Sequence, residues 1–174
     1  MSVPLIVLVG LPGAGKSTIG RRLARALNTE FSDTDEMIEQ RQGLPCGVVF
    51  ASLGEPEFRR LEEDVVAEAL HHEGIVALGG GAVISPRTRE RLASHNVVYL
   101  EVSLDEGIRR TAGKGNRPVL NAADPAARYR ALYEQRRAFY EEVASFKARS
   151  DERSPQRVVA NILSYLDESE EVEV

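Results

Sequence analysis

Short apolar runs alternate along the chain with longer segments in which apolar residues recur every three or four positions. The first run, residues 5–9, reads Leu-Ile-Val-Leu-Val and predicts a strand that is buried on both faces. Comparable runs predict strands at 75–78 and 97–100, and weaker patterns predict two more at 30–32 and 146–148. Because helical periodicity alternates with these strands, the chain is predicted to form an α/β fold with a parallel sheet wrapped by helices.

The helical segments are spaced so that they connect these strands. The clearest covers residues 55–72, where Phe58, Leu61 and Val65 share one apolar face and Gly74 follows the end. The other helices are predicted at 18–27, 37–41, 105–111, 125–143 and 155–166. Neither an internal repeat nor a linker divides the chain, so residues 1–167 are predicted to form a single domain.

The net charge is concentrated at the end of the chain. The 174 residues carry a formal net charge of −5. Five acidic side chains lie near the end, namely Asp167, Glu168, Glu170, Glu171 and Glu173. The remainder is therefore close to neutral, which argues against binding to nucleic acid. Residues 168–174 are predicted to be a disordered, solvated acidic tail.

Cysteine content and apolar runs indicate the compartment. Cys46 is the single cysteine, which excludes an intramolecular disulfide and fits a reducing environment. We expect Cys46 to be a small residue in or near the core. No apolar run approaches the roughly 20 residues of a membrane span, and the N-terminal run lacks a basic leader, so it is a strand and not a signal peptide. The prediction is a cytoplasmic protein that does not contact membranes.

Residues 10–17, Gly-Leu-Pro-Gly-Ala-Gly-Lys-Ser, match the phosphate-binding pattern G-x-x-x-x-G-K-[ST] without a substitution. They lie between the first strand and the first helix. Glycines there let backbone N–H groups turn toward a phosphate, and the helix N-terminus adds a partial positive charge. Lys16 can reach the outer phosphates, and the Ser17 hydroxyl can ligate Mg²⁺. The motif predicts nucleotide binding.

Two further segments follow predicted strands, at the edge of a parallel sheet where ligands bind. In Asp33-Thr34-Asp35, one carboxylate can face the metal and the other an acceptor hydroxyl, as phosphoryl transfer requires. The same aspartates could instead cap the next helix. The run Gly79-Gly80-Gly81 could bring backbone N–H groups close to a ligand, or it could be a flexible turn.

Arginines at three places are candidates for binding anions. Arg59 and Arg136 lie on long helices, where a guanidinium could bind a carboxylate bidentately or pair with neighbouring acids such as Glu62 and Glu134. Arg117 lies in a loop with glycine and asparagine. That loop could close over a reaction and deliver the arginine to the phosphates, or it could be a passive surface loop.

Taken together, these segments resemble the shikimate kinase family, specifically its actinobacterial type. The matching motifs are the phosphate-binding loop through Thr18, Asp33-Thr34-Asp35 with Ile38-Glu39, Gly54-Glu55 with Phe58-Arg59-Arg60, Gly79-Gly80-Gly81-Ala82, Arg117-Pro118, Arg136 with Tyr140, and Arg153 before Pro155. They occur in the family's order from about residue 3 to residue 167. The loop alone is generic, whereas the combination is highly specific.

The resemblance implies a P-loop NTPase fold of the nucleoside monophosphate kinase type, with a five-stranded parallel sheet flanked by helices. It implies a substrate-binding segment over about 33–61 and a lid over about 112–124. The implied reaction transfers the γ-phosphoryl group of ATP to the 3-hydroxyl of shikimate. The products are shikimate 3-phosphate and ADP, a step toward chorismate and the aromatic amino acids. ATP and Mg²⁺ would be required, and the chain would be a monomer.

The same resemblance assigns roles to individual residues. Catalysis would depend on Asp35, which holds and polarises the hydroxyl, and on Lys16 and Arg117, which neutralise the phosphates. Shikimate would contact Asp35, Arg59, Gly79, Gly80, Gly81 and Arg136. ATP would contact Gly13, Ala14, Gly15, Lys16, Ser17, Thr18, Arg110, Arg117, Arg153 and Pro155. Ser17 would ligate Mg²⁺, and Asp33 would hold the ion through water.

One stretch departs from the family pattern. Leu44-Pro45-Cys46-Gly47 replaces a polar stretch that normally starts a helix, so the substrate segment is expected to be more mobile, although no ligand position is lost. Two alternatives stay open: a related small-molecule kinase acting on gluconate or a nucleotide, and a non-catalytic ATP-dependent switch. Two arginines aimed at a carboxylate argue against a nucleotide kinase, and the Phe-Arg-Arg segment argues against a gluconate kinase. The second needs a partner surface that the sequence does not indicate.

Overall fold

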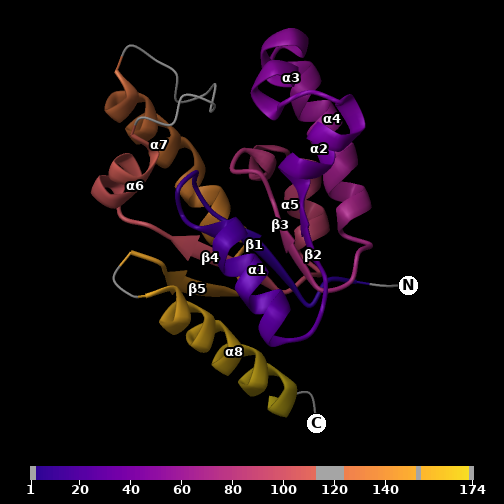
Figure 1. Ribbon diagram of the computed structural model, residues 1–174, viewed down its shortest axis with the longest axis vertical. Coiled ribbons are helices and arrows are strands. Elements are labelled where there is room, and N and C mark those ends of the chain that lie inside the picture. Colours follow the sequence, from indigo (N-terminus) through magenta and orange to yellow (C-terminus); the bar gives the residue numbers. More distant parts are fainter. Residues whose placement is uncertain (1–2, 113–123, 152–153, 173–174) are drawn as a thin grey trace.

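The computed structural model describes residues 3–112, 124–151 and 154–172 of the chain. Its centre is a parallel five-stranded sheet with the strand order β2-β3-β1-β4-β5 (Figure 1). The strands are β1 (Ile6–Val9), β2 (Phe31–Asp33), β3 (Ile75–Ala77), β4 (Val97–Glu101) and β5 (Phe146–Arg149). The prediction of an α/β fold with five parallel strands is confirmed.

Helices cover both faces of this sheet and extend beyond its edge. They are α1 (Lys16–Ala26), α2 (Thr34–Gln42), α3 (Cys46–Leu53), α4 (Glu55–Ala69), α5 (Pro86–Leu92), α6 (Leu104–Thr111), α7 (Pro125–Val143) and α8 (Pro155–Val172), with a short 3₁₀ turn at Ala82–Ile84. Figure 1 shows α2 and α3 grouped at one side of the molecule, and α6 with the start of α7 at the other.

Successive side chains of strand β1 point to opposite faces of the sheet, so this strand contributes to two cores. Val7 and Val9 face a core that includes residues of α4, α5 and α7, whereas Ile6 and Leu8 face a core with α1 and α8. All four side chains are buried. A third, smaller cluster joins α2, α3 and α4 through Ile38, Val49, Phe58 and Val65. These three helices therefore form a packed unit of their own beside the sheet.

The structure adds a helix in the stretch that departs from the family pattern. Helix α3 begins at Cys46 with Pro45 as its N-cap residue, so proline and glycine do not prevent a helix there. Proline is tolerated at this end because the first N–H groups of a helix have no intrahelical acceptor. One such donor, the Cys46 amide, bonds Glu39 Oε2 at 2.9 Å.

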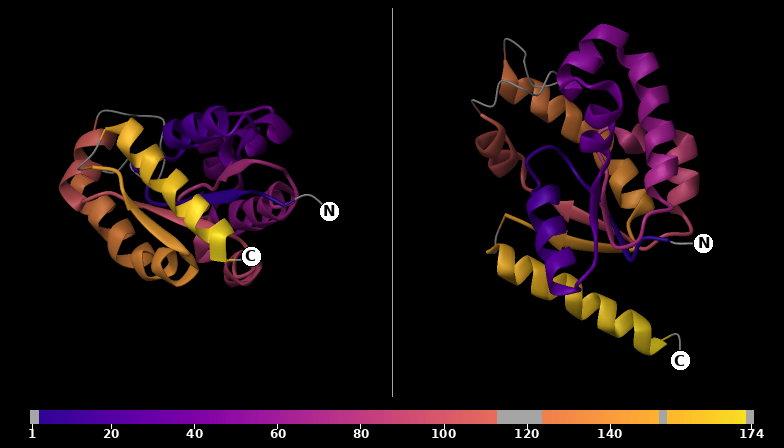
Figure 2. Two further views of the ribbon diagram at one scale, coloured as in Figure 1. Left: turned by 90° about the horizontal axis from the view of Figure 1, so that it is seen from below. Right: turned by 45° about the vertical axis from the view of Figure 1, so that its right-hand side comes forward.

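The C-terminal helix is longer than the sequence pattern indicates. Helix α8 continues to Val172, so the prediction of a disordered tail is wrong for residues 168–172. The packed part of α8, with Val158 and Ile162 buried, supplies the nucleus, and glutamate extends a helix at little cost. Figure 2 shows the last turns projecting past the sheet. None of the helices in the described ranges is long and apolar enough to cross a membrane.

Candidate active site

The loop between β1 and α1 has backbone angles that only glycine adopts readily. Gly13 and Gly15 have φ of 84° and 92°, and α1 begins directly afterwards at Lys16. The Lys16 ammonium lies over the loop, where it donates to the carbonyls of Gly10 at 2.7 Å and Leu11 at 3.1 Å. A helix N-terminus, turned glycines and a lysine above them form an anion site.

Asp33 joins this loop to the next segment and caps α2, which is one of the two functions that the sequence left open. Its Oδ1 accepts the backbone N–H groups of Asp35 at 2.9 Å and Glu36 at 3.3 Å, which caps α2. Its Oδ2 accepts the Ser17 hydroxyl at 2.8 Å. Capping thus holds the carboxylate beside the hydroxyl predicted to ligate Mg²⁺.

Asp35 is the acid at the centre of the site. Burial, followed by the nearby Asp33 carboxylate, raises its pKa from 3.8 to about 6, and Lys16 opposes that rise. The Cys46 thiol donates to Asp35 Oδ1 at 3.9 Å. As expected, Cys46 packs against the small core of α2, α3 and α4, but its contact with Asp35 had no signal in the sequence. Burial and the surrounding carboxylates raise the pKa of this thiol, so it stays protonated.

Two mostly covered arginines converge beside Asp35 from different helices. Arg59 on α4 pairs with Glu62 at 2.8 Å, and Arg136 on α7 is only 2% exposed. Burial lowers the pKa of Arg136, and Arg59 contributes to this lowering through like charge. Burial also raises the pKa of Glu62 to about 7 against the opposing pull of Arg59. The half-exposed Glu55 lies 3.6 Å from Arg59.

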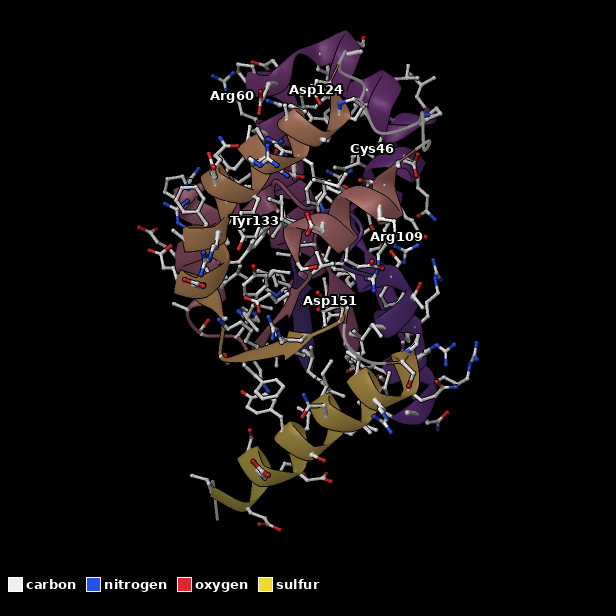
Figure 3. The ribbon with its side chains drawn as sticks, turned by 90° about the vertical axis from the view of Figure 1, so that its left-hand side faces the viewer. Cys46, Arg60, Arg109, Asp124, Tyr133 and Asp151 are labelled. Atoms are coloured by element: carbon white, nitrogen blue, oxygen red, sulfur yellow. The ribbon has the colours of Figure 1, made fainter. Side chains whose placement is uncertain are left out.

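Neighbouring arginines show that this convergence is selective. The side chain of Arg60 is 75% exposed and that of Arg109 is 73% exposed, and both lie at the surface (Figure 3). Arg59 and Arg110, one position away from each, are mostly covered, at 16% and 28%. The fold therefore turns one member of each arginine pair inward.

The three glycines after β3 each make room for a different group of the site. A Cβ added at Gly79 would lie 2.5 Å from the Asp35 carboxylate. At Gly81 it would lie 2.4 Å from the Arg59 guanidinium, and at Gly80 3.3 Å from that of Arg136. The Gly79 amide is fixed by donating to the buried Thr34 hydroxyl at 2.9 Å. Absent side chains, and not flexibility, thus explain the run of glycine.

Arg110 lies at the opposite end of the site from these glycines. Its guanidinium donates to the Gly13 carbonyl at 3.1 Å and to the Ser150 carbonyl at 3.0 Å, which ties the phosphate loop to the segment after β5. Pro155 begins α8 nearby and lines the same cavity. Arg117 and Arg153 lie outside the described residues.

One cavity of about 590 Å³ connects these groups. The predicted site residues that line it are Gly13, Ala14, Gly15, Lys16, Ser17, Thr18, Asp33, Asp35, Arg59, Gly80, Gly81, Arg110, Arg136 and Pro155. Gly79 lies behind Asp35 and does not line it. Glu62, expected from the sequence only as a possible ion-pair partner, also lines the cavity. Phe50 and Phe58 form an aromatic wall that no sequence pattern indicated. Arg59 lies 5.4 Å from the centre of the Phe58 ring.

The parallel sheet, the phosphate-binding loop and the cavity define a P-loop protein of the nucleoside monophosphate kinase type. The family model described as shikimate kinase matches residues 12–167. The chain belongs to the shikimate kinase family.

Relatives of known sequence and structure agree with this assignment. The shikimate kinase of Corynebacterium efficiens is 59% identical over 97% of this chain and 99% of its own. That of Mycobacterium tuberculosis is 55% identical over 94% of this chain and 93% of its own. Shikimate kinase from Acinetobacter baumannii in complex with shikimate superposes with a TM-score of 0.91, at 33% identity over 97% of this chain and 95% of that one. A gluconokinase from Sinorhizobium meliloti shares the fold, with a TM-score of 0.62 at 19% identity over 94% of this chain and 91% of that one.

Proposed function

We propose that this chain transfers the γ-phosphoryl group of ATP to the 3-hydroxyl of shikimate, giving shikimate 3-phosphate and ADP on the route to chorismate. The observation that carries the proposal is that Arg59 and Arg136 both line the same cavity as the phosphate-binding loop and Asp35. An anionic acceptor and a nucleotide would thus lie on either side of the Asp35 carboxylate.

The two guanidinium groups support a carboxylate ligand at this position. Arg59 already has acidic neighbours, since it pairs with Glu62 at 2.8 Å and lies 3.6 Å from Glu55. The Nε atoms of both arginines are buried without a hydrogen-bond partner. A carboxylate, with two acceptor oxygens, would accept from these planar guanidinium groups. The shikimate carboxylate has this form.

Asp35 would act on the reacting hydroxyl. With the acceptor held by the arginines, the Asp35 carboxylate takes the proton of the 3-hydroxyl while that oxygen forms a bond to the γ-phosphorus and the bond to the β-γ bridging oxygen breaks. ADP leaves with the electron pair of that bond. A pKa of about 6 keeps Asp35 mostly ionised at neutral pH, yet makes it a stronger base than an ordinary aspartate.

Lys16 and Arg117 are proposed to neutralise the phosphates, with Arg110, Arg153 and Pro155 beside the adenine. Ser17 and Asp33 would hold Mg²⁺, the aspartate through water, and the ion would neutralise phosphate charge. Their oxygens lie 2.8 Å apart and suit a hard cation. Among the described residues no group of three or more His, Cys, Asp or Glu side chains could hold a metal. Phosphate oxygens and water would complete the coordination.

The test is a calorimetric titration of the protein, saturated with a non-hydrolysable ATP analogue, with shikimate, gluconate and a nucleoside monophosphate. Binding of shikimate alone is expected. Binding of gluconate or a nucleotide instead would indicate a related kinase, and no binding by any of the three would favour an ATP-dependent switch. A monomeric state and a cytoplasmic location remain predictions from the sequence, to be checked by light scattering and cell fractionation.

Arg59→Lys and Arg136→Lys test the residues that carry the proposal. Each is expected to weaken shikimate binding because an ammonium cannot provide the planar fork, while affinity for ATP stays unchanged. Arg60→Lys is the matched control, since Arg60 adjoins Arg59 but lies at the surface. If shikimate affinity in all three variants equals that of the wild type, the arginine pair does not bind the substrate.

A further inference from the structure

Helix α7 passes both ligand-binding loops and touches each with a tyrosine. Its buried residues are Tyr129, Leu132, Arg136 and Tyr140, at spacings of three and four that place them on one face. The Tyr129 hydroxyl donates to the Pro12 carbonyl at 2.8 Å, and the Tyr140 hydroxyl donates to the Gly80 carbonyl at 2.5 Å. Pro12 belongs to the phosphate-binding loop, and Gly80 to the glycine run of the acceptor site.

Both hydroxyl groups are deeply buried, which makes their partners informative. Tyr129 is 0% exposed and Tyr140 is 1% exposed. A phenylalanine could fill the same core, whereas a buried hydroxyl is costly unless it is hydrogen-bonded. Helix α6 also leaves space for one of them, because a Cβ on Gly107 would lie 2.2 Å from the Tyr129 hydroxyl. The surroundings therefore accommodate the Tyr129 oxygen specifically.

The two carbonyls lie on loops that also contact each other. A Cβ on Gly80 would lie 3.1 Å from Pro12 Cδ, so the phosphate loop and the glycine run are in near contact. Arg136 projects from α7 between the two tyrosines in the sequence, and its guanidinium interacts with the Tyr140 side chain. Tyr140 in turn packs against Tyr99 of β4, with ring centres 5.1 Å apart. One helix thus touches both loops and carries Arg136, which is proposed to bind the substrate carboxylate.

We propose that Tyr129 and Tyr140 are positioning residues that set the ATP loop and the acceptor loop relative to each other from one rigid helix. Phosphoryl transfer needs the attacking oxygen and the phosphorus aligned, and an error of about 1 Å between reactants costs rate. Eleven residues of helix, about 16 Å, separate the two tyrosines. Tyr129 positions the loop that binds the phosphoryl donor, ATP, and Tyr140 positions the loop that binds the acceptor. This inference rests on the proposed roles of the two loops.

Single substitutions by phenylalanine separate these roles. Tyr129→Phe removes the bond to Pro12 and is expected to lower kcat, because the phosphate-binding loop loses its alignment. It is also expected to raise KM and Kd for ATP about three- to tenfold, as the loss of one hydrogen bond allows, with shikimate affinity unchanged. Tyr140→Phe removes the bond to Gly80 and frees Arg136. It is expected to raise KM and Kd for shikimate by a similar factor, with ATP affinity unchanged.

Tyr165→Phe is the matched control. The Tyr165 hydroxyl donates to Asn96 Oδ1 at 2.7 Å, away from the cavity, so this variant loses a tyrosine hydrogen bond without touching either loop. Its KM values for both substrates should equal those of the wild type. Melting temperatures of all three variants record any general loss of stability.

The outcomes are distinct. The proposal is supported if Tyr129→Phe weakens the binding of ATP alone and Tyr140→Phe weakens the binding of shikimate alone. Unchanged constants in both variants, or equal weakening of both ligands by either variant, overturns it, since equal weakening indicates general loosening. If one variant does not fold, the other still decides by its selectivity. A wild-type protein that neither binds nor phosphorylates shikimate would instead refute the proposed function.

Discussion

Gly81→Ala tests whether the glycine run exists to make room for Arg59. The backbone does not oppose alanine, because Gly81 has φ −93° and ψ 0°. The obstacle is the Arg59 guanidinium, which has three atoms 2.4–2.5 Å from the place the new Cβ would take. Since ordinary contacts between carbon and other heavy atoms are about 3.5 Å, the guanidinium must shift by about 1 Å.

The expected loss of shikimate affinity follows from how that shift changes the hydrogen bond to a bound carboxylate. An N–H···O bond that is best near 2.9 Å would stretch to about 3.9 Å and no longer count as a hydrogen bond. A bond between charged groups contributes about 1.5–3 kcal/mol. At about 1.4 kcal/mol per factor of ten, Kd for shikimate should rise roughly 10- to 150-fold. The melting temperature should change little, because only the end of a flexible side chain moves.

The assay is calorimetric titration with shikimate, repeated for ATP as an internal control. Affinity for ATP should be unchanged, since Gly81 and the phosphate-binding loop are separate segments. A shikimate Kd within twofold of the wild type would refute the steric reasoning. A double-mutant cycle sharpens the test: in an Arg59→Ala background, Gly81→Ala should have almost no further effect. The same loss in both backgrounds would mean that the new methyl group strikes the ligand itself.

Three other predictions concern Asp35. Asp35→Asn should lower turnover about 10²–10⁴-fold with ATP affinity nearly intact, and more than a tenth of wild-type turnover would exclude the proposed role. Because the pKa of Asp35 is raised to about 6, wild-type kcat/KM for shikimate should fall as pH drops through that value; a flat profile between pH 5 and 8 would contradict this. A raised pKa in an acid means that the folded protein holds the proton more tightly than the unfolded chain. Ionised Asp35 therefore costs stability, and the rise from 3.8 to about 6 corresponds to at most ~3 kcal/mol. In urea unfolding, Asp35→Asn should exceed the wild type in stability at pH 7.5, with the difference shrinking toward pH 5.

Much of the fold could be predicted because its signals are local. Buried parallel strands are short branched apolar runs, and the phosphate-binding loop is a contiguous motif, so β1, α1 and the loop between them are close to the predicted bounds. Two helices lacked such signals. Helix α3 is mostly apolar, without a helical period, and lies between Pro45 and Gly54. Helix α5 is seven residues long, with Thr88 and Leu92 its buried side chains. Family and fold class, inferred from the resemblance, are confirmed.

The site depends on tertiary structure in a way that the sequence does not show. Arg59 and Arg136 are 77 positions apart, and nothing local distinguishes Arg59 from the exposed Arg60. Glu62 has the spacing of an ordinary surface ion pair, yet it is 3% exposed. Whether Arg59 or Arg60 turns inward is decided by how α4 packs beside the glycine run. The resemblance, and not the periodicity, selected the two arginines that line the cavity.

The arrangement of charge gives the site a reason to bind its proposed substrate tightly. Asp35 and Glu62 have raised pKa values, and burial lowers that of Arg136, so the charged forms of all three are costly in the folded protein. Each cost falls when an opposite charge or a hydrogen-bond donor arrives. A carboxylate would stabilise the guanidinium groups, and a hydroxyl would donate to ionised Asp35. The preformed site thus lowers the stability of the folded protein, and a ligand with both groups at the right separation would remove part of this cost on binding. A ligand with the carboxylate alone would remove only the arginine part. Selectivity for a hydroxy acid would therefore follow from the same burial that raises the pKa of the proposed base.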